Sequence, residues 1–114
     1  MYQDTIYLPN GKEVSLAILE TNFPDWFSSD SLQSISALMA SEWRKWEFSS
    51  RQLRYLQQWA RNYAHANGGD KRKWLMVALT GTALDLSVDP KDMLEMFEEN
   101  PATARALFDP SVRL

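Results

Sequence analysis

The sequence of 114 residues contains no cysteine and one histidine, His65. Without cysteine the chain can form neither a disulfide framework nor a thiolate metal site, so nothing indicates an oxidising compartment. One imidazole is too few for the sites with two or three histidines that typically hold zinc. These absences exclude a disulfide-stabilised scaffold, and we expect no bound metal.

Long apolar runs are also missing from the sequence. No stretch approaches the roughly 18 residues that a membrane-spanning helix needs. The first four residues, Met-Tyr-Gln-Asp, lack the basic start and the apolar stretch of a signal peptide. We therefore expect a cytoplasmic protein that does not contact a membrane.

The overall composition is that of an ordinary globular protein. Apolar residues make up 45% of the chain and charged residues 24%, values that argue against disorder. The length suits one hydrophobic core and is too short for two. We predict a single domain over residues 1–114, mainly α in class (α+β), with a β-hairpin at 1–20 and a helical part at 30–109.

Charge is distributed unevenly along the chain. Residues 1–41 hold one lysine and five acids, residues 42–74 hold eight cations and three acids, and residues 75–114 hold three cations and seven acids. The local net charges are therefore −4, +5 and −4. The basic middle third also carries seven aromatic residues, namely Trp43, Trp46, Phe48, Tyr55, Trp59, Tyr63 and Trp74.

Two β-prone runs, residues 4–8 and 12–19, flank a Pro-Asn-Gly sequence at residues 9–11 and predict a hairpin. A three-residue loop pairs Ile6 with Val14. A two-residue turn would shift the register by one residue and pair Leu8 with Glu13, an apolar with an acidic side chain. We favour the three-residue loop, which needs a positive φ at its glycine. It gathers four apolar side chains on one face: Ile6, Leu8, Val14 and Leu16.

Three substantial helices are predicted after the hairpin. Asp30 and Ser49 are each followed three residues later by glutamine, a capping-box pattern that starts helices over residues 30–48 and 49–67. Asp70 caps a third helix that ends near residue 87, with one glycine inside it as a weak point. The expected inward-facing residues of these helices are Leu32, Ile35, Met39, Trp43 and Trp46; Leu53, Leu56, Ala60 and Tyr63; and Leu75, Ala78, Leu79, Thr82 and Leu86.

Two short helices complete the predicted bundle. Asp89-Pro90 and Asn100-Pro101 each place a capping side chain before a proline at the first helical position. The expected architecture is thus an N-terminal β-hairpin followed by a compact bundle of three main helices and two short C-terminal ones.

Residues for catalysis or cofactor binding are sparse in this sequence. No serine lies in a G-x-S-x-G elbow, and His65 falls near the end of a surface helix. The acids after residue 84 do not have the spacing of a calcium loop, and the glycines at 68–69 match no phosphate-binding motif. We expect no cofactor, no metal ion and no enzymatic activity.

Two groups of cations are the candidates for binding a partner. Arg51, Arg54 and Arg61 recur at helical spacing and share one face with His65. Three more cations occupy residues 71–73, where the helix dipole repels them; they would attract an anion, or else pair with the acidic C-terminal third. With two aromatic residues that fall off the apolar stripes, the predicted partner-binding residues are Arg51, Arg54, Trp59, Arg61, Lys71, Arg72, Lys73 and Trp74.

The sequence thus favours a small non-enzymatic domain for protein–protein interaction, acting as an accessory, adaptor or inhibitory subunit. Its charge-segregated surfaces would meet complementary surfaces of a protein partner, and two copies could pair basic with acidic faces as a homodimer. The alternative is a regulatory protein that binds nucleic acid through the basic, aromatic-rich middle third.

Overall fold

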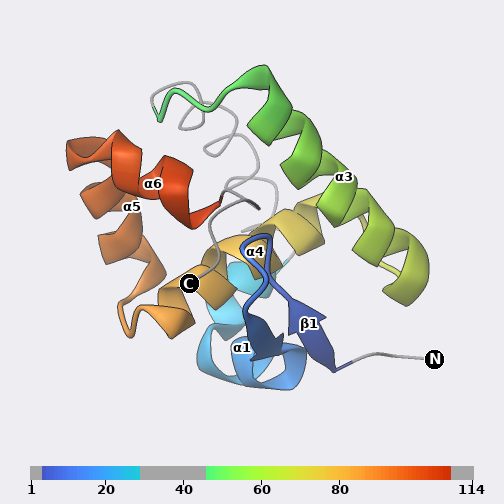
Figure 1. Ribbon diagram of the computed structural model, residues 1–114. Helices are drawn as coiled ribbons and strands as arrows, with labels where there is room; N and C mark the ends of the chain where they lie inside the picture. The colour runs from blue at the N-terminus through green and yellow to red at the C-terminus, as the bar shows by residue number, and fades with distance from the viewer. Residues whose placement is uncertain (1–3, 29–45, 109–114) are drawn as a thin grey trace.

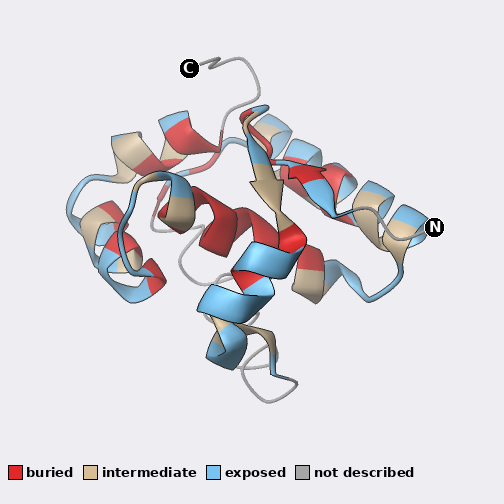
Figure 2. Cartoon of the chain, turned by 90° about the horizontal axis from the view of Figure 1, so that it is seen from below, coloured by how far each residue is buried: buried red, intermediate tan, exposed pale blue. Residues whose placement is uncertain are grey.

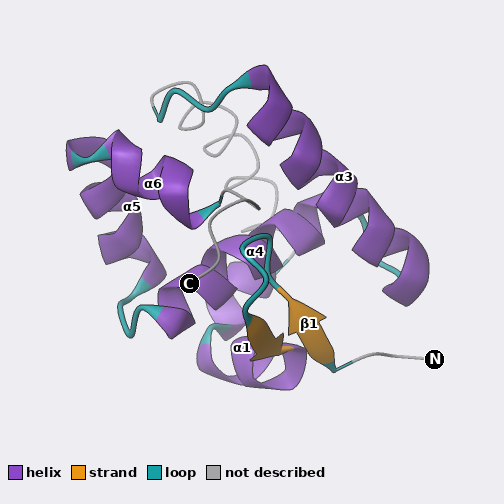
Figure 3. Cartoon of the chain, in the orientation of Figure 1, coloured by secondary structure: helices purple, strands orange, loops and turns teal. Residues whose placement is uncertain are grey.

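The computed structural model describes residues 4–28 and 46–108. Within them, an antiparallel hairpin is followed by helices, so the predicted mainly α class with a small β part is confirmed (Figures 1 and 3). The elements in chain order are β1 (Thr5–Tyr7), β2 (Glu13–Ser15), α1 (Leu16–Asn22), the 3-10 helix η1 (Pro24–Phe27), α3 (Ser50–Asn67), α4 (Lys71–Asp85), α5 (Pro90–Glu99) and α6 (Pro101–Leu107).

The predicted helix over residues 30–48 lies mostly outside the described residues. Its expected end at Phe48 is wrong, because residues 46–49 belong to no helix. Glu47 has a φ of 59°, in the left-handed region that a right-handed helix does not use. The chain therefore turns here before Ser49 starts α3.

The hairpin has the predicted register. Ile6 pairs with Val14, and the loop spans three residues, with the Leu8 N–H donating to the Lys12 carbonyl at 2.7 Å. Gly11 has a φ of 91°, as the loop requires. The apolar pattern and the turn chemistry specify the same register.

The second β-prone run does not continue as a strand to residue 19, as we expected. It ends at Ser15, whose hydroxyl accepts a hydrogen bond from the Ile18 N–H and so caps α1. Asp4 adds a second cap, since its carboxylate accepts from the Ala17 N–H at 2.9 Å. The switch to helix buries Leu16 and Leu19, which lie three residues apart, on one side of α1.

Helix α3 begins and ends as predicted. Ser49 and Gln52 form the capping box, and the helix stops where Gly68 takes a φ of 87°. Leu56 and Ala60 are buried and Leu53 and Tyr63 are partly buried, so the predicted inner stripe is present. The opposite side of α3 is exposed.

Helix α4 is the centre of the fold, and its environment differs from our expectation of one inner stripe. Every residue from Trp74 to Ala83 is buried, because α1, η1, α3 and α5 all pack against this helix. Figure 1 shows α3 on one side of α4 and the α5–α6 pair on the other, and Figure 2 shows the burial of the central helix. Asp70 caps α4 as predicted.

Gly81 is not simply a weak point of α4. A Cβ atom at this position would lie 2.5 Å from Cδ2 of Leu8, which is itself 2% exposed. The hairpin can approach the helix this closely only because the helix has no side chain there. Lys12 adds an ion pair between the two elements, with its Nζ 2.9 Å from the Asp85 carboxylate.

The two short helices start at the predicted prolines. The Asp89 side chain accepts from the Lys91 N–H, whereas Asn100 makes no side-chain capping bond, which corrects half of the prediction. Edge-to-face aromatic contacts join this end of the fold to residues 46–48; they link Trp46, Phe48, Phe97 and Phe108. None of the described helices has the length and apolar character needed to cross a membrane.

Candidate functional site

The outer face of α3 carries a row of arginines. Arg51, Arg54 and Arg61 are all exposed, and no acidic residue occurs between Ser50 and Asn67. None of the three forms a salt bridge with another described residue. From the first to the last arginine the row is about 15 Å long at 1.5 Å per residue. The structure therefore brings these three predicted residues together on one open surface.

The cations on other elements are mostly neutralised within the chain. Lys12 pairs with Asp85, Lys73 with Glu20 and Arg72 with Asp70. Arg105 reaches the Glu47 carboxylate at 3.4 Å and donates to the Trp46 carbonyl at 2.9 Å. The arginines of α3 therefore differ from these cations, whose charges are paired with acidic residues of the same chain.

The three cations at residues 71–73 do not act as one group. Arg72 binds the Asp70 carboxylate at 2.7 Å, and this hydrogen bond, the largest cause, lowers the pKa of Asp70 below its ordinary value. Lys73 lies 3.8 Å from Glu20 and 5.5 Å above the Trp74 ring. Their pairing partners come from the cap and from α1 rather than from the C-terminal third. Of the three, only Lys71 is exposed without an ion pair to a described residue.

Both tryptophans proposed for an exposed binding patch are buried. Trp59 is 8% exposed and its Nε1 donates to the Tyr7 carbonyl at 2.8 Å, while Trp74 is fully buried and donates to the Gly68 carbonyl at 2.9 Å. Tyr63 lies between the two rings, stacked on that of Trp74. The prediction that they are exposed is wrong. Both lie off the main apolar stripes, but β1 covers the side of α3 that carries Trp59, and residues 68–70 cover the side of α4 that carries Trp74.

His65 and the acids of α5 are exposed on helix surfaces. In the described part of the chain, no group of three or more histidine and acidic side chains could hold a metal ion. The acids of α5 occupy its outer side, as expected for a solvated face: Asp92, Glu95, Glu98 and Glu99.

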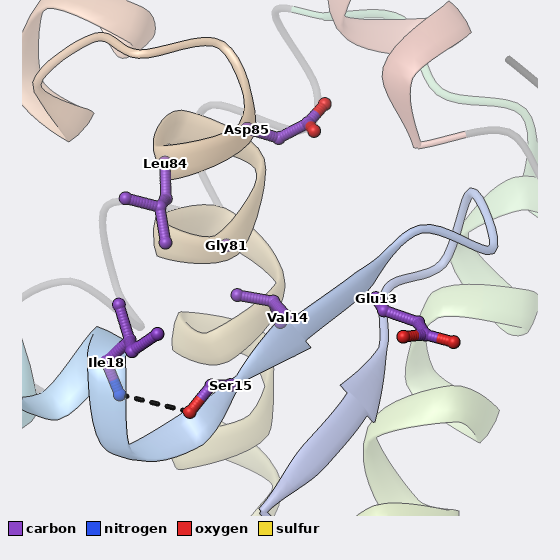
Figure 4. Close-up of a pocket in the computed structure, with 7 residues that line it drawn as sticks. All are labelled: Glu13, Val14, Ser15, Ile18, Gly81, Leu84 and Asp85. Atoms are coloured by element: carbon purple, nitrogen blue, oxygen red, sulfur yellow. Dashed lines mark hydrogen bonds between the residues drawn. The ribbon is translucent and has the colours of Figure 1, made fainter.

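A shallow hollow beside β2 was not anticipated from the sequence. It has a volume of about 290 Å³ and lies between β2, the first turn of α1 and the C-terminal half of α4. Figure 4 shows Val14, Ile18 and Leu84 pointing toward it, with Gly81 behind. Ile18 is 49% exposed. The hollow could have been predicted only if the change from strand to helix at Ser15 had been predicted first, because that change places Val14 and Ile18 side by side.

Comparisons with known proteins add no family to this description. No protein-family model matches the chain, and no characterised protein or solved structure matches it.

Proposed function

We propose that this chain is a small protein-binding domain, an accessory, adaptor or inhibitory subunit, that docks on an acidic surface of its partner through the outer face of α3. One observation carries the proposal: three arginines lie exposed on one helix face that contains no acid, and none of them forms an ion pair with an acid among the described residues. Arginine suits this role because its planar guanidinium binds carboxylates through two hydrogen bonds, and it is enriched at protein interfaces.

The position of the aromatic residues favours a protein partner over nucleic acid. Binding to a single strand typically combines cations with exposed aromatic rings on which bases stack. Trp59 and Trp74, the aromatic residues predicted to bind a partner, are buried in the core. The hydroxyl of Tyr55 donates a hydrogen bond to the Pro9 carbonyl at 3.3 Å. A nucleic-acid ligand would have to be bound by the arginines alone, so it is the second candidate.

A binding role rather than a catalytic one is part of the proposal. His65, the one histidine, is exposed on the same helix, with no carboxylate from α3 itself to orient it. General acid–base catalysis requires a positioned partner within hydrogen-bond distance. In this reading, His65 adds to the polar face of α3.

The test compares capture of partners by three tagged forms of the protein. They are the parent, a triple variant Arg51→Gln, Arg54→Gln and Arg61→Gln, and the control Lys91→Gln, which removes an exposed cation from α5. Each substitution should change the free energy of unfolding by no more than about 0.5 kcal/mol, because the side chains are solvated. Circular dichroism checks the fold.

After nuclease treatment of the host extract, the parent and Lys91→Gln should retain a protein at fixed stoichiometry that the triple variant loses. Equal capture by all three forms would refute the role of α3. If nuclease removes the captured material, and binding of a labelled oligonucleotide weakens steeply with salt in the parent but less so in the triple variant, the nucleic-acid function takes its place.

The homodimer and the cytoplasmic location remain part of the proposal. Exposed acids of α5, such as Asp92 and Glu95, offer the arginine face of a second copy opposite charge. Sedimentation of the purified protein at several concentrations tests self-association. A single monomeric species at all concentrations would remove the homodimer.

A further inference from the structure

The two strands of the hairpin have outer edges whose backbone groups point away from the partner strand. In an antiparallel pair, residues that exchange hydrogen bonds alternate with residues whose N–H and C=O groups face outward. Leu8 and Lys12 are a bonded pair, so the neighbouring pair, Tyr7 and Glu13, directs its backbone groups outward. Tyr7 faces out from β1 and Glu13 from β2.

Helix α3 covers the edge of β1. The Tyr7 N–H donates to the Tyr63 hydroxyl at 2.9 Å, and the Tyr7 carbonyl accepts from Trp59 Nε1 at 2.8 Å. The corresponding groups of Glu13 have no hydrogen-bond partner among the described residues. An uncovered edge of this kind is a template for pairing with another strand.

The hollow lies along this open edge. Val14, Ile18 and Leu84 surround about 290 Å³, which is at or below the lower limit for sites that take drug-sized molecules. The space therefore suits an aliphatic side chain presented from a neighbouring backbone. Val14 and Glu13 project to opposite faces of β2, so the hollow is on one face and the Glu13 carboxylate on the other.

The surroundings of the open edge are acidic. Two acidic residues, Glu13 and Asp85, line the hollow, and residues 4–28 contain one lysine and four acids, of which Glu20 pairs with Lys73. The lysine, Lys12, is already bonded to Asp85, whereas Glu13 is exposed and forms no ion pair with a described residue. A cationic segment would complement this edge, and a second copy of the same acidic edge would not.

We propose that β2 binds an extended peptide segment of a partner protein by strand addition. One aliphatic side chain of the segment enters the hollow between Val14, Ile18 and Leu84. The residues on either side of it project to the opposite face, where a lysine or arginine pairs with Glu13. This second binding surface lies on the far edge of the hairpin from α3 and does not use the arginine face.

The probe for this proposal is a fluorescein-labelled peptide of about ten residues, in which lysine alternates with valine or leucine, read by fluorescence anisotropy. Ile18→Asn and Glu13→Lys should each weaken binding roughly tenfold, because one removes apolar contact and the other reverses the charge. Tyr7→Asn is the matched control, since Tyr7 is 52% exposed on the covered edge. All three positions are exposed, so circular dichroism should show an unchanged fold.

Two further measurements make the test specific. Added peptide should slow hydrogen exchange of the Glu13 and Ser15 amides and leave that of Tyr7, which is already bonded, unchanged. The triple arginine variant of α3 should bind the peptide like the parent, which separates this proposal from the proposed function.

The proposal is overturned if the peptide does not bind, if a glutamate–valine peptide binds equally well, or if Ile18→Asn and Tyr7→Asn behave alike. It is also overturned if the protein dimerises with rising concentration and Ile18→Asn abolishes the dimer. In that outcome the occupant of the edge is a second copy of this chain.

Discussion

Helices α3 and α4 follow each other in sequence but have different environments. Helix α3 buries one side and presents arginines on the other, whereas α4 is buried on every side over ten residues, Trp74 to Ala83. A helix packed on one side keeps a free face for a partner. A helix enclosed by its neighbours stabilises the fold and has little surface left for binding.

The cations of the two helices show the same difference. On α3 none of the arginines pairs with an acid in the described part of the chain, while at the start of α4 two of three cations pair with Asp70 and Glu20. Exposed ion pairs contribute little free energy, so these contacts serve mainly to neutralise a dipole repulsion where the helix begins. Function should therefore depend on the α3 cations and stability on the apolar residues of α4.

The largest expected effect comes from Trp74 in α4. Trp74→Ala should lower the free energy of unfolding by about 3–5 kcal/mol, since it removes a buried ring and leaves a cavity. The control in α3 is Tyr55→Ala, which removes a 37% exposed ring and one hydrogen bond, at a cost of about 1–2 kcal/mol. Urea denaturation measures both; equal losses would contradict the contrast between the helices.

An intermediate effect is expected at Gly81. Helix propensity alone predicts that Gly81→Ala stabilises by about 1 kcal/mol. The new methyl group would collide with Leu8 in a packed region, so we expect a net loss of about 1 kcal/mol instead. In a Leu8→Ala background the collision disappears and the substitution should become stabilising. Thermal melting of the parent, the two single variants and the double variant measures both effects. The prediction fails if Gly81→Ala shifts the melting temperature in the same direction with Leu8 present and in the Leu8→Ala background.

The smallest effect concerns the caps. The Arg72 hydrogen bond lowers the pKa of Asp70 below 3.8 in the folded state, so its stabilisation is present above the unfolded pKa and is lost as pH falls through the folded pKa. The melting-temperature difference between the parent and Asp70→Asn should shrink in this acid range. Ser49→Asn at α3 is the control: its difference from the parent should not change with pH, because serine does not titrate. A constant difference for Asp70→Asn would contradict the prediction.

Local chemistry made much of this fold predictable from the sequence. The hairpin register, the capping box at Ser49, the cap at Asp70 and the starts of α5 and α6 all follow from interactions within a few residues. The arginine face of α3 was predictable for the same reason, since helical spacing alone places Arg51, Arg54 and Arg61 together. That these arginines face solvent agrees with the inner stripe expected on the other side.

The features that the sequence did not reveal depend on contacts between distant segments. The burial of Trp59 comes from β1, more than fifty residues earlier in the chain, and the need for Gly81 comes from Leu8. The hollow beside β2 likewise combines Val14 and Ile18 with Leu84. Spacing within one element specifies which side chains share a face, but which neighbour covers that face depends on packing. The sequence alone therefore determined the hairpin register, the starts of α3 to α6 and the cationic face, because these depend on neighbouring residues. The tertiary structure decided where the second strand gives way to α1, which aromatics are buried and, within residues 4–28 and 46–108, which strand edge stays open.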